Sequence, residues 1–173
     1  MRTILVIRHA EKPDGAHQGV DITGAVDQES LIPLGWQRAG ALATLFGLRG
    51  TLPAPDRIYA SALRKSKRPV ETVTPLARKL RKNPIETYSK GDEAGLVAEI
   101  AGLDGTTLVC WQHEAIPQIA RLITEQPAGI PDPWPRDRFD VVWRFTREGN
   151  DKPWAFDQVC QGLLSGDGTQ PIT

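Results

Sequence analysis

Short apolar runs of strand length alternate along this chain with longer segments that carry apolar residues at helical spacing. Residues 4–7 are four consecutive aliphatic residues, the pattern of a strand buried on both faces inside a parallel sheet. We expect further strands at 57–60, 85–88, 106–111, 140–145 and 154–159, and helices at 33–46, 69–77, 92–100 and 116–123. This alternation predicts an α/β fold, a three-layer α/β/α sandwich with a mainly parallel central sheet. The last two strands flank a Gly-Asn turn, which predicts one antiparallel edge strand.

Length and charge indicate one folded domain with no general preference for a polyanionic partner. The 173 residues are expected to form a single domain, 1–173, with a frayed tail over 164–173. The 21 basic and 21 acidic residues balance, which argues against binding of nucleic acid or of an anionic membrane. No apolar run reaches transmembrane length, and the N-terminal run is too short for a signal peptide, so we expect a cytoplasmic protein. Cys110 and Cys160 lie in apolar surroundings and are expected to be buried free thiols.

Two of the three histidines, His9 and His113, directly follow predicted strands of the sheet. In open α/β sheets, ligands bind just beyond the carboxyl ends of the strands. Arg8 precedes His9, and this pair combines a fork of donors suited to phosphate or carboxylate with a side chain that titrates near neutrality. Arg64 and Arg68 follow another predicted strand, where the amides of a helix N-terminus also attract anions. These residues therefore indicate an anion-binding site at one edge of the sheet.

Four short motifs join these residues into one ordered pattern. They are Arg8-His9-Ala10 after the first strand, Leu31 to Gly35 at the entry of a helix, Arg68 four residues before Thr72, and His113 at the end of a later strand. In these motifs the chain resembles the histidine phosphatase superfamily, also called the phosphoglycerate-mutase-like superfamily, over roughly residues 3–125. Their order and their places relative to the strands carry the resemblance, because each motif alone is short.

The resemblance implies covalent catalysis at His9. His9 would take the phosphoryl group, and water would then hydrolyse the phosphohistidine. Arg8 and Arg68 would hold the phosphoryl oxygens, with Arg64 as the alternative to Arg68 and a candidate for substrate binding, and His113 would stabilise the developing charge. Phosphoryl transfer requires positioning and neutralisation of charge, which two arginines and a second imidazole supply without a metal or another cofactor. The implied activity is a metal-independent phosphomonoester hydrolase acting on a small phosphorylated substrate, with a phosphoprotein as an alternative.

Two positions compete for the general acid that protonates the leaving group. Glu114 directly follows His113, where some members of the superfamily carry a carboxylate. Other members use a glutamate after the third strand, where Asp92 and Glu93 lie, but helix capping and first-turn charge also explain those two residues. We choose Glu114 as the general acid and keep Glu93 as a candidate for substrate binding.

Other functions remain open at this point. The chain could be a phosphate-binding or regulatory module with little turnover, or a phosphotransferase of the phosphoglycerate mutase type. A zinc hydrolase motif would need a second histidine where Pro117 stands, so no metal site is expected. Residues 128–140, around Trp134, either cover the sheet edge or form a flap over the site. The sequence leaves the oligomeric state open.

Overall fold

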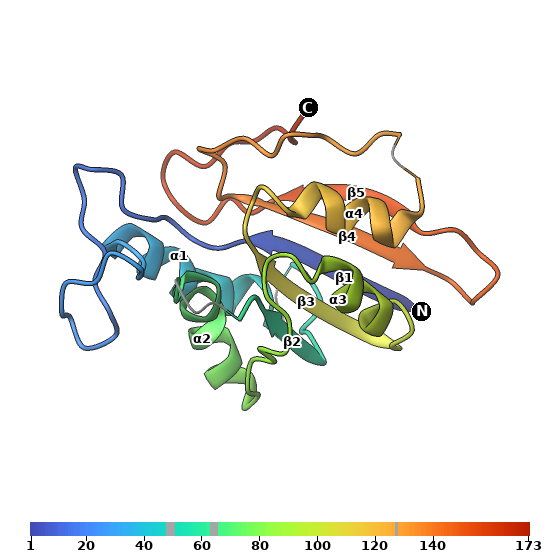
Figure 1. Cartoon of the computed structure of the whole chain (residues 1–173), viewed down its shortest axis with the longest axis horizontal. Coiled ribbons are helices and arrows are strands. Elements are labelled where there is room, and N and C mark those ends of the chain that lie inside the picture. The colour runs from blue at the N-terminus through green and yellow to red at the C-terminus, as the bar shows by residue number, and fades with distance from the viewer. Residues whose placement is uncertain (48–50, 63–65, 127) are drawn as a thin grey trace.

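The computed structural model describes residues 1–47, 51–62, 66–126 and 128–173, and it places one five-stranded sheet between helices (Figure 1). The strands lie in the order β2-β3-β1-β4-β5. In chain order the elements are β1 (Arg2–Arg8), α1 (Pro33–Leu45), β2 (Arg57–Ala60), α2 (Arg68–Leu80), α3 (Glu93–Ile100), β3 (Gly105–Trp111), α4 (Ile116–Thr124), β4 (Val141–Arg147) and β5 (Ala155–Cys160).

The sheet is mixed, with a parallel part and an antiparallel edge, as the sequence predicted. Strand β1 pairs in parallel with β3, and β3 pairs in parallel with β2. On its other side β1 pairs antiparallel with β4, which pairs antiparallel with the edge strand β5. Four of these five strands therefore run in the same direction, and β4 runs against them.

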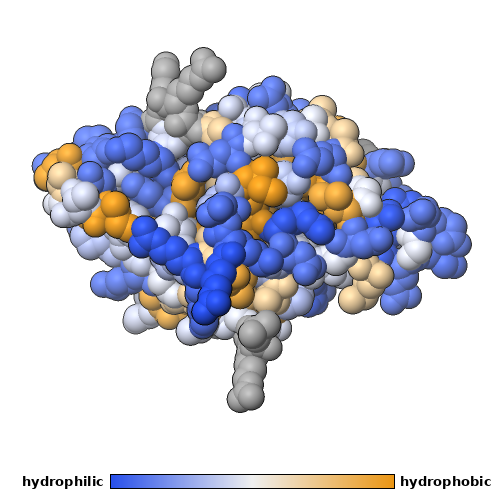
Figure 2. All heavy atoms as spheres, turned by 90° about the horizontal axis from the view of Figure 1, so that it is seen from below, coloured by the Kyte–Doolittle hydropathy of each residue, from blue (hydrophilic) through white to orange (hydrophobic). Residues whose placement is uncertain are grey.

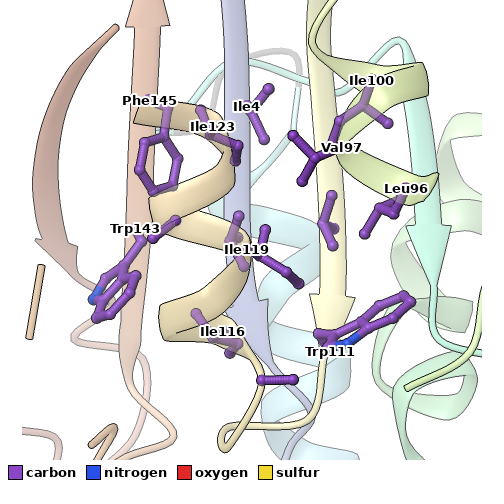
Figure 3. Packing of buried hydrophobic residues seen from close by; sticks show 14 of the residues in the cluster. Ile4, Leu96, Val97, Ile100, Trp111, Ile116, Ile119, Ile123, Trp143 and Phe145 are labelled. Carbon is purple, nitrogen blue, oxygen red and sulfur yellow. The ribbon is translucent and has the colours of Figure 1, made fainter. Parts of the chain in front are cut away.

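Alternate residues of β1 point to opposite faces of the sheet and create two separate cores, because successive side chains of a strand alternate in direction. Ile4 and Val6 pack into the core formed with α3 and α4, where Figure 3 shows the isoleucines of α4 facing the sheet. Leu5 and Ile7 pack into the other core, together with residues of α1 and α2. All four side chains are buried, as expected of a strand with helices on both faces. The three-layer sandwich is confirmed.

Two local predictions around the third helix were wrong. Residues 85–88 do not form a strand, because only Ile85 makes a single bridge to Tyr59 of β2. Asp92 does not cap α3 with its side chain. Its carboxylate instead accepts a hydrogen bond from the Ser89 amide, which closes the preceding turn. The propensity of a residue for a strand or for a helix cap does not decide its structure where a neighbouring group competes for the same hydrogen bonds.

Residues 164–173, for which the sequence predicts a frayed tail, make side-chain and backbone contacts with the rest of the fold. The amide of Ile172 donates to Oε1 of Gln158, and Nε2 of Gln158 donates to the Ile172 carbonyl. Ile172 is buried in the same core as the isoleucines of α4, and Asp167 forms a buried ion pair with Arg38 of α1. A tail rich in glycine and serine is therefore held by one apolar anchor and one charged anchor.

The segment around Trp134 covers the sheet next to β4. The indole packs at 4.8 Å, centroid to centroid, on Trp143 of β4, and its Nε1 donates to the Arg138 carbonyl. On the face seen in Figure 2, apolar side chains form separate small areas among hydrophilic ones. Within the described ranges, no helix combines the length and the apolar character that crossing a membrane requires.

Candidate active site

The parallel pairing of β1 with β3 brings the two strand-end histidines to the same edge of the sheet. Arg8, the last residue of β1, lies opposite Trp111, the last residue of β3. The amide of His9 continues this pairing with a 3.0 Å hydrogen bond to the Trp111 carbonyl. His113, two residues after β3, is close enough to lower the pKa of His9. The proximity of His9 and His113 thus follows from the register in which β1 and β3 pair.

The imidazole of His9 is held in one tautomer. Its Nδ1 lies 2.8 Å from the carbonyl oxygen of Ala10, and since a carbonyl can only accept, Nδ1 carries the proton. The lone pair is therefore on Nε2. His9 is 4 % exposed, and burial, reinforced by the charges of Arg8 and Arg68, lowers its pKa to about 3. His9 is consequently a neutral base with an oriented lone pair at physiological pH.

The start of α2 fastens the segment after His9. The amide of Ala10 donates to Oγ1 of Thr72 at 2.8 Å, and that hydroxyl donates to the carbonyl of Arg68 at 2.7 Å. Arg68 is the first residue of α2, and its guanidinium donates to the carbonyl of Gln28. Among the described residues, Nε of Arg68 is buried and has no hydrogen-bond partner. The four-residue spacing of Arg68 and Thr72 therefore places the first turn of α2 against the backbone that follows His9. Nε of Arg68 stays available as a donor for a ligand.

The guanidinium of Arg8 is held from one side by the segment before β4. Its Nη1 donates to the carbonyls of Pro135, Arg136 and Arg138 at 3.3, 2.6 and 3.2 Å, and its carbon lies 3.7 Å from the ring centroid of Phe139. Nε and Nη2 are buried and have no hydrogen-bond partner in the part of the chain that the structure describes. An unpaired buried donor costs about 1–3 kcal/mol, and a phosphoryl oxygen would satisfy two such donors at once. The fork of Arg8 is thus fixed in place with two donors unused.

A cleft of about 530 Å³ lies beside His113. It is lined by Lys12, His113, Glu114 and the segment from Pro133 to Arg136. The pKa of His113 is lowered to about 4, mainly by burial and then by the charge of Arg8. Trp134 thus packs on β4 and also lines this cleft, whereas a flap movement of its segment stays a prediction.

Glu114 is ionised in this cleft. Burial alone would raise its pKa, but the hydrogen bond from Lys90, its own amide and the nearby His113 lower it to about 2. Its Oε1 lies 2.7 Å from Nζ of Lys90. Its Oε2 lies 2.9 Å from Nδ1 of His113, without hydrogen-bond geometry. Glu114 can donate a proton only after a bound dianionic phosphoryl group raises its pKa through like-charge repulsion.

The remaining candidates lie elsewhere. Glu93 is buried, with 2 % of its surface exposed. Its carboxylate accepts hydrogen bonds from the Gly91 amide and from Nε1 of Trp111. These contacts give Glu93 a structural task under the strand end and do not bring it into the cleft beside His113. Arg64, the alternative to Arg68, lies outside the described residues. No group of three or more His, Cys, Asp or Glu side chains within the described ranges is arranged to hold a metal ion.

Neither a protein-family model nor a curated protein sequence matches this chain, but solved structures do. A phosphoserine phosphatase mutant from Entamoeba histolytica, in complex with phosphoserine, superposes with a TM-score of 0.60 at 13 % identity, covering 94 % of this chain and 98 % of its own. The protein histidine phosphatase SixA, complexed with tungstate, superposes with a TM-score of 0.57 at 15 % identity, over 92 % and 97 % of the two chains. This chain has the histidine phosphatase fold.

The same fold extends over almost the whole length of a third structure. The mycobacterial glucosyl-3-phosphoglycerate phosphatase superposes with a TM-score of 0.57 at 15 % identity, covering 91 % of this chain and 97 % of its own. The fold implied by the sequence motifs is thereby confirmed. In this histidine phosphatase fold the predicted residues Arg8, His9, Arg68, His113 and Glu114 gather around one edge of the sheet.

The low pKa of His9 has a consequence for stability. An unfolded histidine has a pKa near 6.5, whereas folded His9 has one of about 3, so the unfolded state binds the extra proton as the pH falls through this window. Lowering the pH from 7 to 5 is therefore expected to reduce the free energy of unfolding by about 2 kcal/mol through His9 alone. Urea unfolding of the wild type and of His9→Gln at both pH values measures this, because the variant lacks that share of the loss. Equal pH dependence in the two proteins would contradict the buried neutral state of His9.

Proposed function

We propose that this chain hydrolyses phosphomonoesters, without a metal, through a phosphohistidine intermediate at Nε2 of His9. The observation that carries the proposal is the state of His9, which is neutral, fixed by Ala10 in the tautomer with a free Nε2, and surrounded by the cations Arg8 and Arg68. The neighbouring phosphatases support the reaction class through their shared fold.

The reaction has two displacements at phosphorus. In the first, the lone pair of Nε2 forms a bond to phosphorus while the ester P–O bond breaks, and Glu114, once protonated, gives its proton to the leaving oxygen. In the second, water attacks phosphorus and returns a proton to Glu114, and the P–N bond breaks to release phosphate and neutral His9. Arg8 and Arg68 hold the phosphoryl oxygens throughout, and His113 donates a hydrogen bond to the same group.

The proposed partner is a small phosphorylated molecule. The structural neighbours are named for phosphoserine, for a protein histidine and for glucosyl-3-phosphoglycerate, which share a phosphoryl group and little else. We therefore take from them the phosphate chemistry and not a particular substrate. A cleft of about 530 Å³ falls within the range of roughly 300–1,000 Å³ that small-molecule sites occupy.

One observation favours a phosphate-binding module as the second candidate. Glu114 is ionised and paired with Lys90, so a weakly bound substrate would leave it without a proton to donate. Phosphate would then bind to Arg8 and Arg68, and turnover would be slow. The two candidates predict the same affinity for phosphate but different rates of release of the alcohol.

The test combines turnover with capture of the intermediate. The chain is incubated with an aryl phosphate and an excess of chelator, and samples are quenched in alkali, in which phosphohistidine survives, or in acid, in which it does not. We expect continuous release of the phenol and of phosphate, and an acid-labile phosphoryl group on His9. Binding of phosphate without turnover would favour the binding module, and turnover abolished by the chelator would exclude a metal-independent reaction.

A further inference from the structure

A second cavity lies next to the histidine site and is mostly apolar. It has a volume of about 450 Å³. Its apolar walls are Pro13, Ile32, Pro33, Leu34 and Phe139. Leu34, in the first turn of α1, is one of the few large apolar side chains in the described residues that are exposed, at 44 %. A single exposed leucine is ordinary, but this one forms part of the wall of a cavity.

The apolar cavity lies next to the cleft beside His113 and shares two lining residues with it. Lys12 and Arg136 line both this cavity and the cleft beside His113. The ring of Phe139, which lines the apolar cavity, has its centroid 6.4 Å from that of His9 and carries the guanidinium of Arg8 on its face. A molecule whose phosphoryl group lies between His9 and Arg8 therefore has the ring of Phe139, a wall of the apolar cavity, close to that group.

The floor of the cavity is fixed. Glu11 and Phe139 both line it, and each is held by an arginine. Arg38 binds Oε1 of Glu11 through Nε at 2.9 Å and Nη2 at 2.8 Å. Arg8 stacks on Phe139. A cavity whose walls are held by buried contacts is preorganised, which lowers the conformational cost of filling it.

We propose that this cavity binds the organic part of the substrate, and that the preferred substrates are phosphomonoesters of apolar, aromatic-sized alcohols. This inference rests on the proposed phosphate site. The occupant is a small molecule, because the space is recessed, close to the nucleophile and within the volume range of small-molecule sites. Lys12 and Arg136, which line both spaces, place positive charge where the spaces adjoin. Of the two spaces, the acidic residues Glu11, Asp14 and Asp137 line only this cavity, where they disfavour a second anionic group.

The test measures affinity with phosphonates, which cannot be hydrolysed, so that binding is separated from turnover. The ratio of affinities for naphthylmethylphosphonate and methylphosphonate is determined by calorimetry for the wild type. We expect the naphthyl compound to bind at least about tenfold more tightly, because it buries an additional aromatic surface. The variant Leu34→Gln is expected to reduce this ratio at least about threefold while leaving the affinity for methylphosphonate unchanged.

A matched control comes from α4. Leu122 is 37 % exposed and lines neither cavity, so Leu122→Gln makes the same chemical change elsewhere and should keep the wild-type ratio. A ratio near one in the wild type, or an unchanged ratio in Leu34→Gln, would overturn the apolar subsite and leave the proposed hydrolysis standing. If neither phosphonate binds, the phosphate site itself is wrong and the subsite falls with it. A peptide carrying the non-hydrolysable phosphonate analogue of phosphoserine that binds more tightly than the naphthyl compound would assign the cavity to a protein substrate and overturn the proposal.

Discussion

Replacement of His9 by alanine is expected to reduce kcat for phosphomonoester hydrolysis by at least about four orders of magnitude, since it removes the nucleophile. The remaining residues could still neutralise charge, but the variant lacks the free Nε2 that His9 offers while its Nδ1 is bound to the Ala10 carbonyl. Residual activity therefore reflects attack by water on a bound phosphate ester. Steady-state rates with an aryl phosphate and a chelator measure the effect, and the phosphorylated intermediate should disappear with the activity.

Binding separates loss of the nucleophile from loss of the site. Arg8 and Arg68 hold their guanidinium groups through carbonyls of distant segments, not through His9, so His9→Ala should still bind inorganic phosphate within about threefold of the wild type. The variant His9→Gln keeps more of the buried volume and checks whether a cavity disturbs the fold. An alanine variant that keeps more than a few per cent of the wild-type rate would show that another group attacks the phosphorus.

The strand ends of this chain could be predicted because the signal is local. Four aliphatic residues followed by Arg-His identify β1 and the end of the strand at which the polar residues lie. The apolar run before His113 identifies β3 and its end in the same way. Parallel neighbours present their carboxyl ends together, so two such ends predict one site. Arg68 and Thr72 could be related because helical spacing places them on one face of the same turn.

The partners of Arg8 could not be predicted, because they come from far along the chain. The carbonyls of Pro135, Arg136 and Arg138 and the ring of Phe139 reach Arg8 only after β4 has paired with β1. A segment rich in proline predicts turns but not the group that it will face. The only available signal was the position of this segment, directly before the strand that pairs with β1.

Glu93 shows that a correctly predicted helix can leave the role of one of its side chains undecided. The helix α3 was predicted close to its observed bounds. An acidic residue in its first turn could have bound the substrate or stabilised the N-terminus of the helix. The structure uses this carboxylate for the indole of Trp111, since a buried Nε1–H needs an acceptor. Sequence spacing cannot distinguish these roles, because the tryptophan that decides between them lies on another element, at the end of β3.

The second large effect is expected in stability. Arg38 is 4 % exposed and joins three segments, since it pairs with Glu11 after β1, with Asp167 in the tail and with Gln161 after β5. The variant Arg38→Met is expected to lower the free energy of unfolding by about 3–5 kcal/mol at pH 7, because it leaves two buried carboxylates without their cation. Urea unfolding followed by tryptophan fluorescence measures the change.

The matched control for Arg38→Met is Arg144→Met. Arg144 also forms a two-point contact with a carboxylate, that of Asp157, but on the solvent side of the β4-β5 hairpin, where both side chains are at least one-third exposed. Its loss is expected to cost less than about 1 kcal/mol, since water solvates the freed charge. Replacing Glu11 and Asp167 by Gln and Asn in Arg38→Met should restore part of the stability, because it removes the stranded charges. If Arg38→Met costs no more than Arg144→Met, the carboxylates around Arg38 are reached by water, and neither the tail nor the floor beneath Glu11 is held by this ion pair.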